Sequence, residues 1–161
     1  LPSFGGEITT TPIDEIDSKI LKILSINARM DIIALASQIK VPASTTALRI
    51  KKLQQKKIID GFFSFTRCQN YGFQNHIIFL SFKNYSQKDE QKIYSYCQQH
   101  PNIVYIIKTV GKWDYELSVE VPDLPFLQTI LSDLKENFSE ILINMEIITL
   151  FRDLKYNLYP F

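Results

Sequence analysis

The chain has 161 residues and a formal net charge of +1, and it is 45% hydrophobic, 22% charged and 12% aromatic. These proportions are typical of an ordinary globular protein, and they exclude a disordered, collagen-like or disulfide-stabilised chain. No apolar run reaches the roughly 18 residues that a membrane-spanning helix needs. Two cysteines, Cys68 and Cys97, make no disulfide framework, so a cytoplasmic location is expected.

Residues 1–12 are predicted to form an extended tail, since they contain a Gly-Gly pair, two prolines and three consecutive threonines. Residues 13–66 are predicted to form a first domain that begins with three short helices. These helices are expected at residues 14–26, 32–39 and 43–55. Asp31 is the expected N-cap of the second helix, because an aspartate side chain accepts hydrogen bonds from the first free backbone N–H groups.

The end of this domain carries a hairpin signal. Two apolar pairs, Ile58-Ile59 and Phe62-Phe63, flank Asp60-Gly61. An Asp-Gly pair between two apolar runs is typical of a β-hairpin. Three short helices and a hairpin predict a winged helix-turn-helix, in which the last helix enters the major groove of DNA.

Charge is unevenly distributed along the chain. Residues 13–66 hold nine Lys or Arg and five Asp or Glu, a balance of +4, whereas the rest of the chain carries −3. Residues 40–57 hold six Lys or Arg and no acid. Such a segment favours a surface for a polyanion, although a solvated basic helix has the same composition.

The third predicted helix has two different faces. Thr46, Ile50 and Leu53 form its inner stripe, and the opposite face begins with hydroxyl residues and ends with lysines. Hydroxyl groups suit base edges and phosphates, and lysines suit phosphates, although a helical hairpin used for protein contacts is the alternative. The residues predicted to contact DNA are Ser44, Thr45, Leu48, Arg49, Lys51 and Lys52.

The second half of the chain changes its hydrophobic period. Residues 67–75 are predicted to be a linker and residues 76–161 a second domain. Strands are expected at residues 76–82, 103–110, 113–121 and 141–150, and helices at residues 86–99 and 124–138. The order βαββαβ predicts a ferredoxin-like sandwich, so the whole chain is expected to be α+β.

The predicted sheet has one face that its own helices leave uncovered. Phe79, Tyr105 and Phe151 are aromatic residues beyond those that the core needs. Exposed aromatic side chains favour packing against a second sheet, which predicts a homodimer or a higher even-numbered oligomer.

The pattern of residues gives little indication of a catalytic site or a metal site. Among Cys68, His76, Cys97 and His100, only Cys97 and His100 have the spacing of metal ligands. No nucleophile lies beside a candidate base, and five glycines form no phosphate-binding loop. The sequence therefore predicts no catalytic group, no metal and no cofactor.

Several short motifs resemble those of a known family. They lie at residues 13–21, 27–30, 49–53, 58–59, 111–114 and 151–155. Together they resemble the Lrp/AsnC (leucine-responsive/asparagine regulator) family of transcription factors over residues 13–155. Gly111-Lys112-Trp113-Asp114 is similar to the Gly-x-aromatic-Asp turn of that family's effector-binding domain.

The resemblance has three departures near the predicted recognition helix. Lys40 and Lys57 stand where the family usually has glycine, and Pro42-Ala43 replaces its usual Ser-Pro. Ser44 is therefore expected to take over the N-cap of the third helix. The flanking segments resemble a subgroup with two such units in tandem, so the chain is expected to be the C-terminal half of a longer regulator.

The resemblance implies a cytoplasmic, sequence-specific regulator that binds double-stranded DNA as a dimer and senses an amino acid or related metabolite. Its effector site would involve Thr109, Gly111, Trp113 and Asp114. A turn offers backbone N–H groups to a carboxylate, and Asp114 suits an ammonium group. The alternative is that Gly111 only makes the turn and Asp114 only pairs locally.

Besides a DNA-binding regulator, two alternative functions, an enzyme and an interaction module, remain open at this point. Some relatives with this layout act as tetrapyrrole decarboxylases, which place ionisable groups in the effector-domain cavity. The third alternative is a ligand-sensing interaction module that does not bind DNA. Lys40, Pro42 and Lys57 favour that module slightly, and the basic segment 40–57 favours DNA binding.

Overall fold

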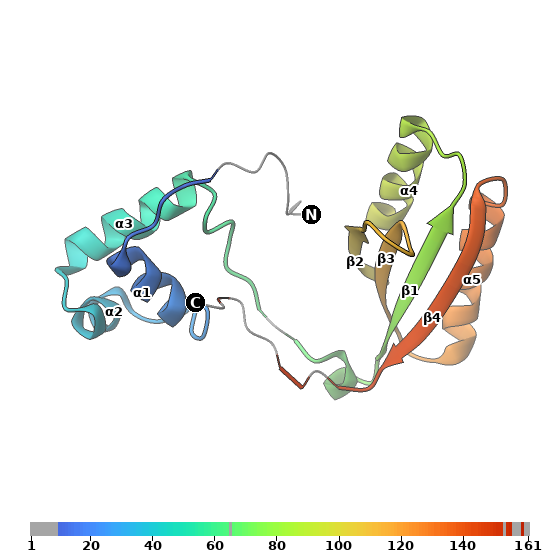
Figure 1. Ribbon diagram of the computed structural model, residues 1–161. Helices are drawn as coiled ribbons and strands as arrows, with labels where there is room; N and C mark the ends of the chain where they lie inside the picture. The colour runs from blue at the N-terminus through green and yellow to red at the C-terminus, as the bar shows by residue number, and fades with distance from the viewer. Residues whose placement is uncertain (1–9, 65, 153, 156–158, 160–161) are drawn as a thin grey trace. The chain divides into compact units, whose positions relative to one another are not determined.

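The computed structural model describes residues 10–64, 66–152, 154–155 and 159, so most of the predicted tail lies outside the described residues. The chain divides into two compact units (Figure 1). The first unit contains residues 1–65 together with residues 154–161, and the second contains residues 66–153. The sequence pattern had grouped residues 154–161 with the second domain.

The first unit contains three helices, α1 (Glu15–Leu24), α2 (Ile32–Ile39) and α3 (Ala43–Gln55). The Asp14 carboxylate accepts from the Asp17 backbone N–H at 2.8 Å and begins α1 with a reciprocal capping box. The predicted N-cap of α2 is confirmed, because the Asp31 carboxylate accepts from the Ile33 backbone N–H at 2.8 Å. Local side chains therefore set where both helices begin.

The core of the first unit is small. Among the described residues, its central cluster of buried apolar side chains consists of Ile20, Leu24, Leu35, Ile39 and Leu53. Thr46 is also buried on the inner side of α3, where its hydroxyl donates to the Pro42 carbonyl at 3.1 Å. Because so few side chains hold these helices, their caps and ion pairs carry a larger share of the stability.

The turns that close α2 and α3 each contain a lysine in the left-handed backbone conformation. Lys40 has φ 56° and Lys57 has φ 53°. After α3, the Lys57 N–H donates to the Gln54 carbonyl at 3.0 Å and the Ile58 N–H to the Leu53 carbonyl at 2.9 Å. This bonding pattern is a Schellman motif, which usually has glycine at the left-handed position.

The hairpin prediction for residues 58–63 is wrong. None of the described residues between α3 and the short 3₁₀ helix η1 (Cys68–Tyr71) forms a strand. The Ile58 and Ile59 N–H groups both donate to the Leu53 carbonyl, so the first apolar pair closes α3 and covers its end. Phe62 and Phe63 remain exposed. Ile58 and Ile59 therefore form the C-terminal cap of α3 and do not pair as a strand of a hairpin.

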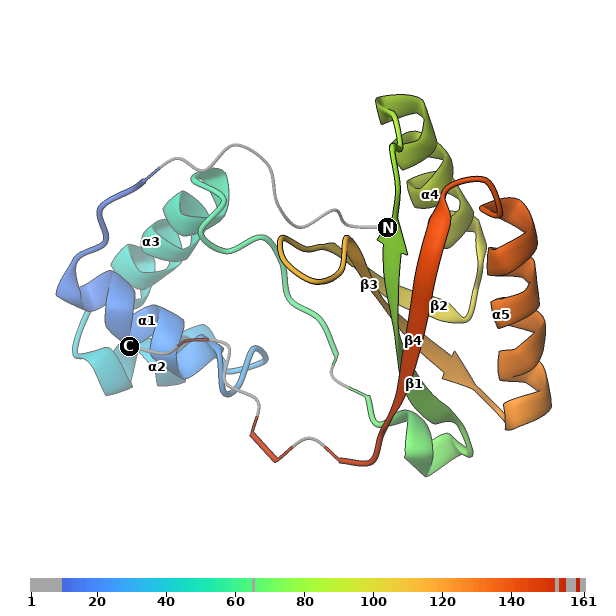
Figure 2. The same cartoon turned by 45° about the vertical axis from the view of Figure 1, so that its right-hand side comes forward.

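The second unit is a four-stranded antiparallel sheet with two helices. The strands are β1 (Gln74–Phe82), β2 (Ile103–Lys108), β3 (Tyr115–Val121) and β4 (Leu142–Leu150), and the helices are α4 (Gln87–Gln99) and α5 (Leu124–Asn137). The strand order β2-β3-β1-β4 confirms the predicted ferredoxin-like arrangement. Figure 2 shows α4 and α5 on the same face of this sheet.

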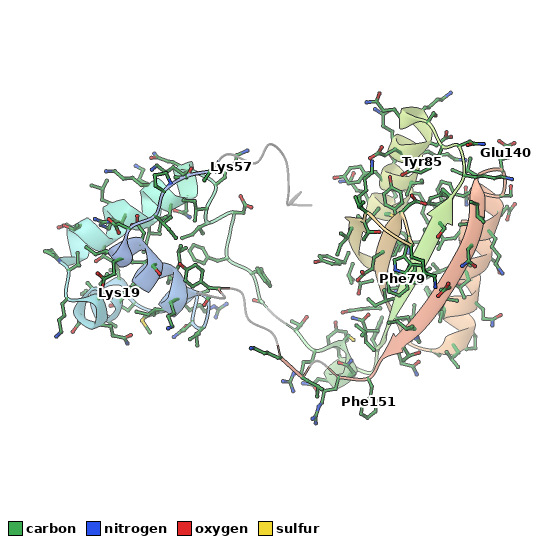
Figure 3. The ribbon with its side chains drawn as sticks, viewed as in Figure 1. Lys19, Lys57, Phe79, Tyr85, Glu140 and Phe151 are labelled. Atoms are coloured by element: carbon green, nitrogen blue, oxygen red, sulfur yellow. The ribbon has the colours of Figure 1, made fainter. Side chains whose placement is uncertain are left out.

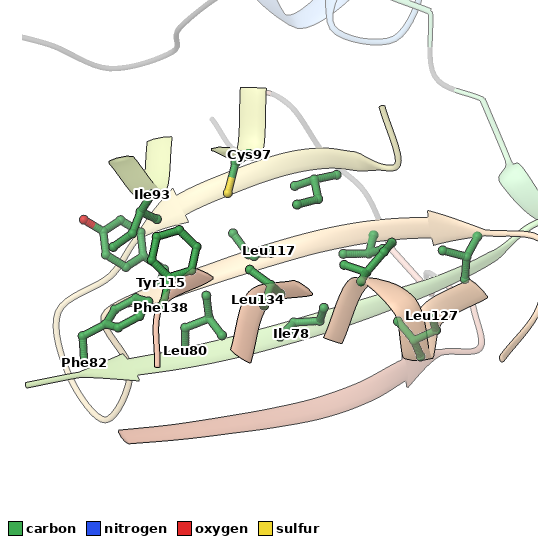
Figure 4. Packing of buried hydrophobic residues seen from close by; sticks show 14 residues of the cluster. Ile78, Leu80, Phe82, Ile93, Cys97, Tyr115, Leu117, Leu127, Leu134 and Phe138 are labelled. Carbon is green, nitrogen blue, oxygen red and sulfur yellow. The ribbon is translucent and has the colours of Figure 1, made fainter. Parts of the chain in front are cut away.

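The main core of the second unit lies between the sheet and these two helices (Figure 4). Ile78 and Leu80 of β1 and Leu117 of β3 are almost completely buried there, and Ile93 and Leu134 contribute from α4 and α5. Burying each such side chain stabilises the fold by about 1.5 to 3 kcal/mol. The alternate residues Tyr115, Leu117, Val119 and Val121 of β3 are buried because this face of the strand packs on the helices.

The other face of the sheet is open. The strand register places Tyr105, Ser118, Ile77 and Ile148 in one row that crosses all four strands. Tyr105 is 53% exposed and Ile148 is 48% exposed. Phe79 lies on this face next to that row, and Phe151 follows β4 (Figure 3). The uncovered face that the sequence predicted is thus present and carries exposed apolar side chains.

Candidate nucleic-acid interface and effector turn

The exposed side of α3 carries most of the predicted DNA-contacting residues. Ser44, Thr45, Leu48, Lys51 and Lys52 are all exposed, and their spacing places them on one side of the helix. Leu48 is 53% exposed. Among the described residues, no carboxylate forms an ion pair with Lys51 or Lys52. This side of α3 therefore presents hydroxyl groups near its start and cationic groups near its end.

The structure places Arg49 differently from its neighbours on α3. Its guanidinium group contacts the Asp14 Oδ2 atom at 2.6 Å and the Asp17 Oδ1 atom at 2.8 Å. The pKa of Asp14 is lowered, first by the Asp17 backbone N–H and then by Arg49. Arg49 thus ties the middle of α3 to the first turn of α1. Because the partners are more than 30 positions apart, periodicity along the sequence could not reveal this contact.

The expectation that Ser44 caps α3 is wrong. Pro42 occupies the N-cap position, and no side chain caps this helix end. Ser44 is already the second residue of α3, and its exposed side chain points away from the core. The first backbone N–H groups of α3 are therefore left without a side-chain cap, at the positive end of the helix dipole.

The predicted effector residues are brought together in the turn between β2 and β3. Gly111 has φ 149°, a conformation that side-chain-bearing residues rarely adopt. The Thr109 hydroxyl donates to the Trp113 carbonyl at 2.7 Å, which closes the turn. The Asp114 Oδ2 atom accepts from the Phe82 backbone N–H at 2.7 Å. Asp114 therefore fastens the turn to the end of β1.

Trp113 is held on the open face of the sheet by its neighbours. Its ring stacks on Phe79 with 4.7 Å between the centroids, and the Lys112 ammonium lies 4.0 Å from its ring centroid. Lys112 also forms an ion pair with Glu146 of β4 at 3.0 Å. Lys112 and Glu146 were not among the predicted site residues. The strand register, which only pairing in space determines, brings Glu146 beside Phe79.

The histidines and cysteines are spread over β1, η1 and the C-terminal end of α4. His76 is buried in β1, where its Nδ1 atom lies 3.0 Å from the Thr149 hydroxyl, and burial lowers its pKa. His100 follows α4, Cys97 is buried within α4, and Cys68 is buried in η1. In the ranges that the structure describes, no three His, Cys, Asp or Glu residues form a metal-binding group.

Comparison with known proteins indicates which family of domains the three helices resemble. Residues 13–54, which include α1 to α3, match the AsnC-type helix-turn-helix domain. The HTH-type transcriptional regulator Ptr1 of Methanocaldococcus jannaschii is 28% identical over 121 residues, which are 75% of this chain and 80% of that protein. The helix-turn-helix of this chain is thus similar to that of AsnC-type transcriptional regulators.

Other relatives cover different shares of the chain. An uncharacterised HTH-type transcriptional regulator of Pyrococcus horikoshii is 45% identical over 51 residues, about a third of the length of each protein. A crystal structure of a transcriptional regulator from Neisseria meningitidis in complex with L-methionine has a TM-score of 0.81 at 16% identity, covering 92% of this chain and 96% of that one. The latter likeness shows a shared fold. Within the described residues, every helix is too short or too polar to cross a membrane.

Proposed function

We propose that this chain is an Lrp/AsnC-type, sequence-specific DNA-binding transcriptional regulator that acts in the cytoplasm and responds to a small metabolite. The observation that carries the proposal is the exposed hydroxyl and lysine side of α3 within the AsnC-type helix-turn-helix. A helix of this composition suits the major groove, where polar side chains reach base edges and lysines neutralise phosphates.

The residues of α3 take different roles in this proposal. Ser44 and Thr45 approach base edges or phosphates, and Leu48 meets the methyl group of a thymine. Lys51 and Lys52 bind phosphates further along the backbone. Arg49 supports the interface by holding α3 against the first turn of α1, since Asp14 and Asp17 already bind its guanidinium group. Its contribution to DNA binding is therefore orientation of the helix.

Dimerisation through the open sheet face is part of the proposal. The exposed Tyr105 and Ile148 side chains lie in one row across that face, and a second copy of the sheet would remove them from water. A dimer presents two recognition helices, which reach successive major grooves when their spacing is about 34 Å. Analytical ultracentrifugation of the Ile148→Glu variant is expected to show a larger monomer fraction than the parent chain.

The turn at residues 109–114 is the proposed effector site. The similar fold from Neisseria meningitidis was solved as a complex with L-methionine, which supports an amino acid as the ligand class. Backbone N–H groups of the turn suit the ligand carboxylate. Asp114 uses Oδ2 to accept from Phe82 and contributes Oδ1 to the ligand ammonium group. Isothermal titration with the individual amino acids tests this assignment.

The main test is selection of genomic DNA fragments on the purified protein, followed by affinity measurements across a salt series. We expect a pseudo-palindromic site and an affinity that falls steeply as salt increases. The variant with Lys51→Glu and Lys52→Glu should lose DNA binding and keep its fold. The matched control carries Lys83→Glu and Lys88→Glu, which change two exposed lysines of the second unit. Equal affinity of the two variants would contradict the proposed interface.

A further inference from the structure

One row of the open sheet face combines an aromatic residue with acidic residues beside the turn at residues 109–114. The strand register places Phe79 of β1 between Glu116 of β3 and Glu146 of β4, and all three residues are half-buried. This row lies next to the apolar row that contains Tyr105, on the side of the turn. Two carboxylates therefore flank one aromatic ring at the point where the proposed effector turn meets the sheet.

The protein's own Lys112 shows which chemical group this row accepts. Its ammonium group lies 4.0 Å from the centroid of the Trp113 ring and 3.0 Å from the Glu146 Oε1 atom. The Trp113 ring stacks on Phe79. An aromatic face next to a carboxylate attracts a cation through both the ring quadrupole and the full negative charge. One side of the aromatic stack therefore already holds an ammonium group, which neutralises Glu146.

Glu116 is the carboxylate of this row that is not neutralised. In the part of the chain that the structure describes, all ion pairs involve other carboxylates. The register places the apolar Ile107 of β2 opposite Glu116. A half-buried carboxylate among apolar neighbours has lost part of its hydration, and a cation that pairs with it compensates for that loss. Glu120 on the same face of β3 differs, because the Tyr71 hydroxyl donates to it at 2.8 Å.

Glu116 lies within reach of a ligand that is held at the turn. Asp114 is the last residue of the turn, and Glu116 is the second residue of β3. Two residues of chain span at most about 7 Å. A lysine side chain, with its flexible four-carbon stem, covers a distance of this order, and so does an arginine side chain. The methylene groups of such a side chain leave water when they contact the stacked Phe79 and Trp113 rings.

We propose that the effector of the turn at residues 109–114 is an amino acid with a cationic side chain, whose positive group pairs with Glu116. The inference rests on the proposed effector site and narrows its ligand class. The main-chain groups of the ligand bind at the turn, and its terminal ammonium or guanidinium group reaches Glu116. A ligand with an apolar side chain, such as the L-methionine in the similar fold from Neisseria meningitidis, leaves this carboxylate without a partner.

Calorimetric titration of the full chain with L-lysine and with L-norleucine tests this inference, because norleucine lacks only the terminal ammonium group. We expect L-lysine to bind about tenfold more tightly. Glu116→Gln should weaken L-lysine binding by about the same factor and leave L-norleucine binding unchanged, since the amide keeps the shape and removes the charge. The matched control is Glu120→Gln, which removes an equal charge from the same face of β3 and should leave the affinity for L-lysine unchanged. Fluorescence of Trp113, the single tryptophan, gives a second readout of binding.

The possible outcomes separate this inference from the proposed effector site. Binding of L-norleucine or L-methionine as tight as that of L-lysine would overturn the cationic ligand and leave the effector site in place. An equal loss of L-lysine and L-norleucine binding in Glu116→Gln would overturn the pairing of Glu116 with the ligand side chain. If the parent chain binds none of the individual amino acids, the proposed effector site itself fails, and this inference fails with it.

Discussion

The two units of the molecule hold their helices in place by different means. Among the described residues, the second unit has fourteen buried residues in one cluster between a sheet and two helices, whereas the first has five. The first unit supplements its core with one capping box, one aspartate N-cap, two Schellman turns and an ion-paired arginine. A small core makes local and polar contacts decisive, and a layered core makes them secondary.

Loss of one core leucine from the first unit should have the largest effect. Leu35→Ala removes a fully buried side chain of α2 and should destabilise the first unit by about 2 to 5 kcal/mol. Trp113 is the single tryptophan and lies in the second unit. We expect helix-sensitive circular dichroism to show early unfolding while Trp113 fluorescence keeps its transition. Simultaneous loss of both signals would show that the units unfold together.

A backbone substitution in the second unit should have a smaller effect. Gly111→Ala meets open space but forces alanine into φ 149°, at a cost of about 1 to 3 kcal/mol. The change should alter the stacking of Trp113 on Phe79 and shift the fluorescence maximum. Gly61→Ala is the matched control, because that position is equally open and does not have a positive φ in the restricted range. Similar effects of both substitutions would argue against a strained turn.

The lysines that end α2 and α3 offer a stabilising change. Lys40→Gly and Lys57→Gly should each stabilise the first unit by about 1 kcal/mol, because glycine adopts left-handed backbone conformations without steric cost. Ser37→Gly inside α2 should instead destabilise it by a similar amount. Denaturant titration of the three variants measures these opposite signs. Destabilisation by Lys40→Gly would mean that its side chain contributes more than its backbone costs.

The smallest expected effect is a dependence of stability on pH in the first unit. The folded-state pKa of Asp14 is lowered by the Asp17 N–H and by Arg49, so this carboxylate stabilises the fold above its unfolded pKa. That contribution is lost as the pH falls below about 4 and through the folded pKa. Arg49→Met should therefore make the unfolding midpoint less sensitive to acid.

Lys19→Met is the control for this pH experiment. It removes an exposed ion pair with Glu15 within α1 and leaves the contact between α1 and α3 intact. Exposed pairs within one helix contribute little, so this variant should follow the parent chain more closely. If Lys19→Met and Arg49→Met change the acid response equally, the contact between the helices has no special role.

Much of the architecture could be predicted because it depends on short-range patterns. Alternation along residues 115–121 indicates a strand with one buried face, and Asp31 before an apolar helix indicates an N-cap. The hairpin at residues 58–63 could not be excluded in this way. Its apolar pair suits both a strand and a helix cap, and the Lys57 backbone conformation decided between them.

The sequence by itself determined the helices of the first unit, the βαββαβ order and the basic side of α3, because periodicity and charge are local properties. Only the tertiary structure decided that Arg49 binds Asp14 and Asp17, that Glu146 and Lys112 lie beside Trp113, and that Tyr159 contacts Ser18. These contacts join residues far apart in the chain. Their formation depends on how whole elements pack, which no local spacing encodes.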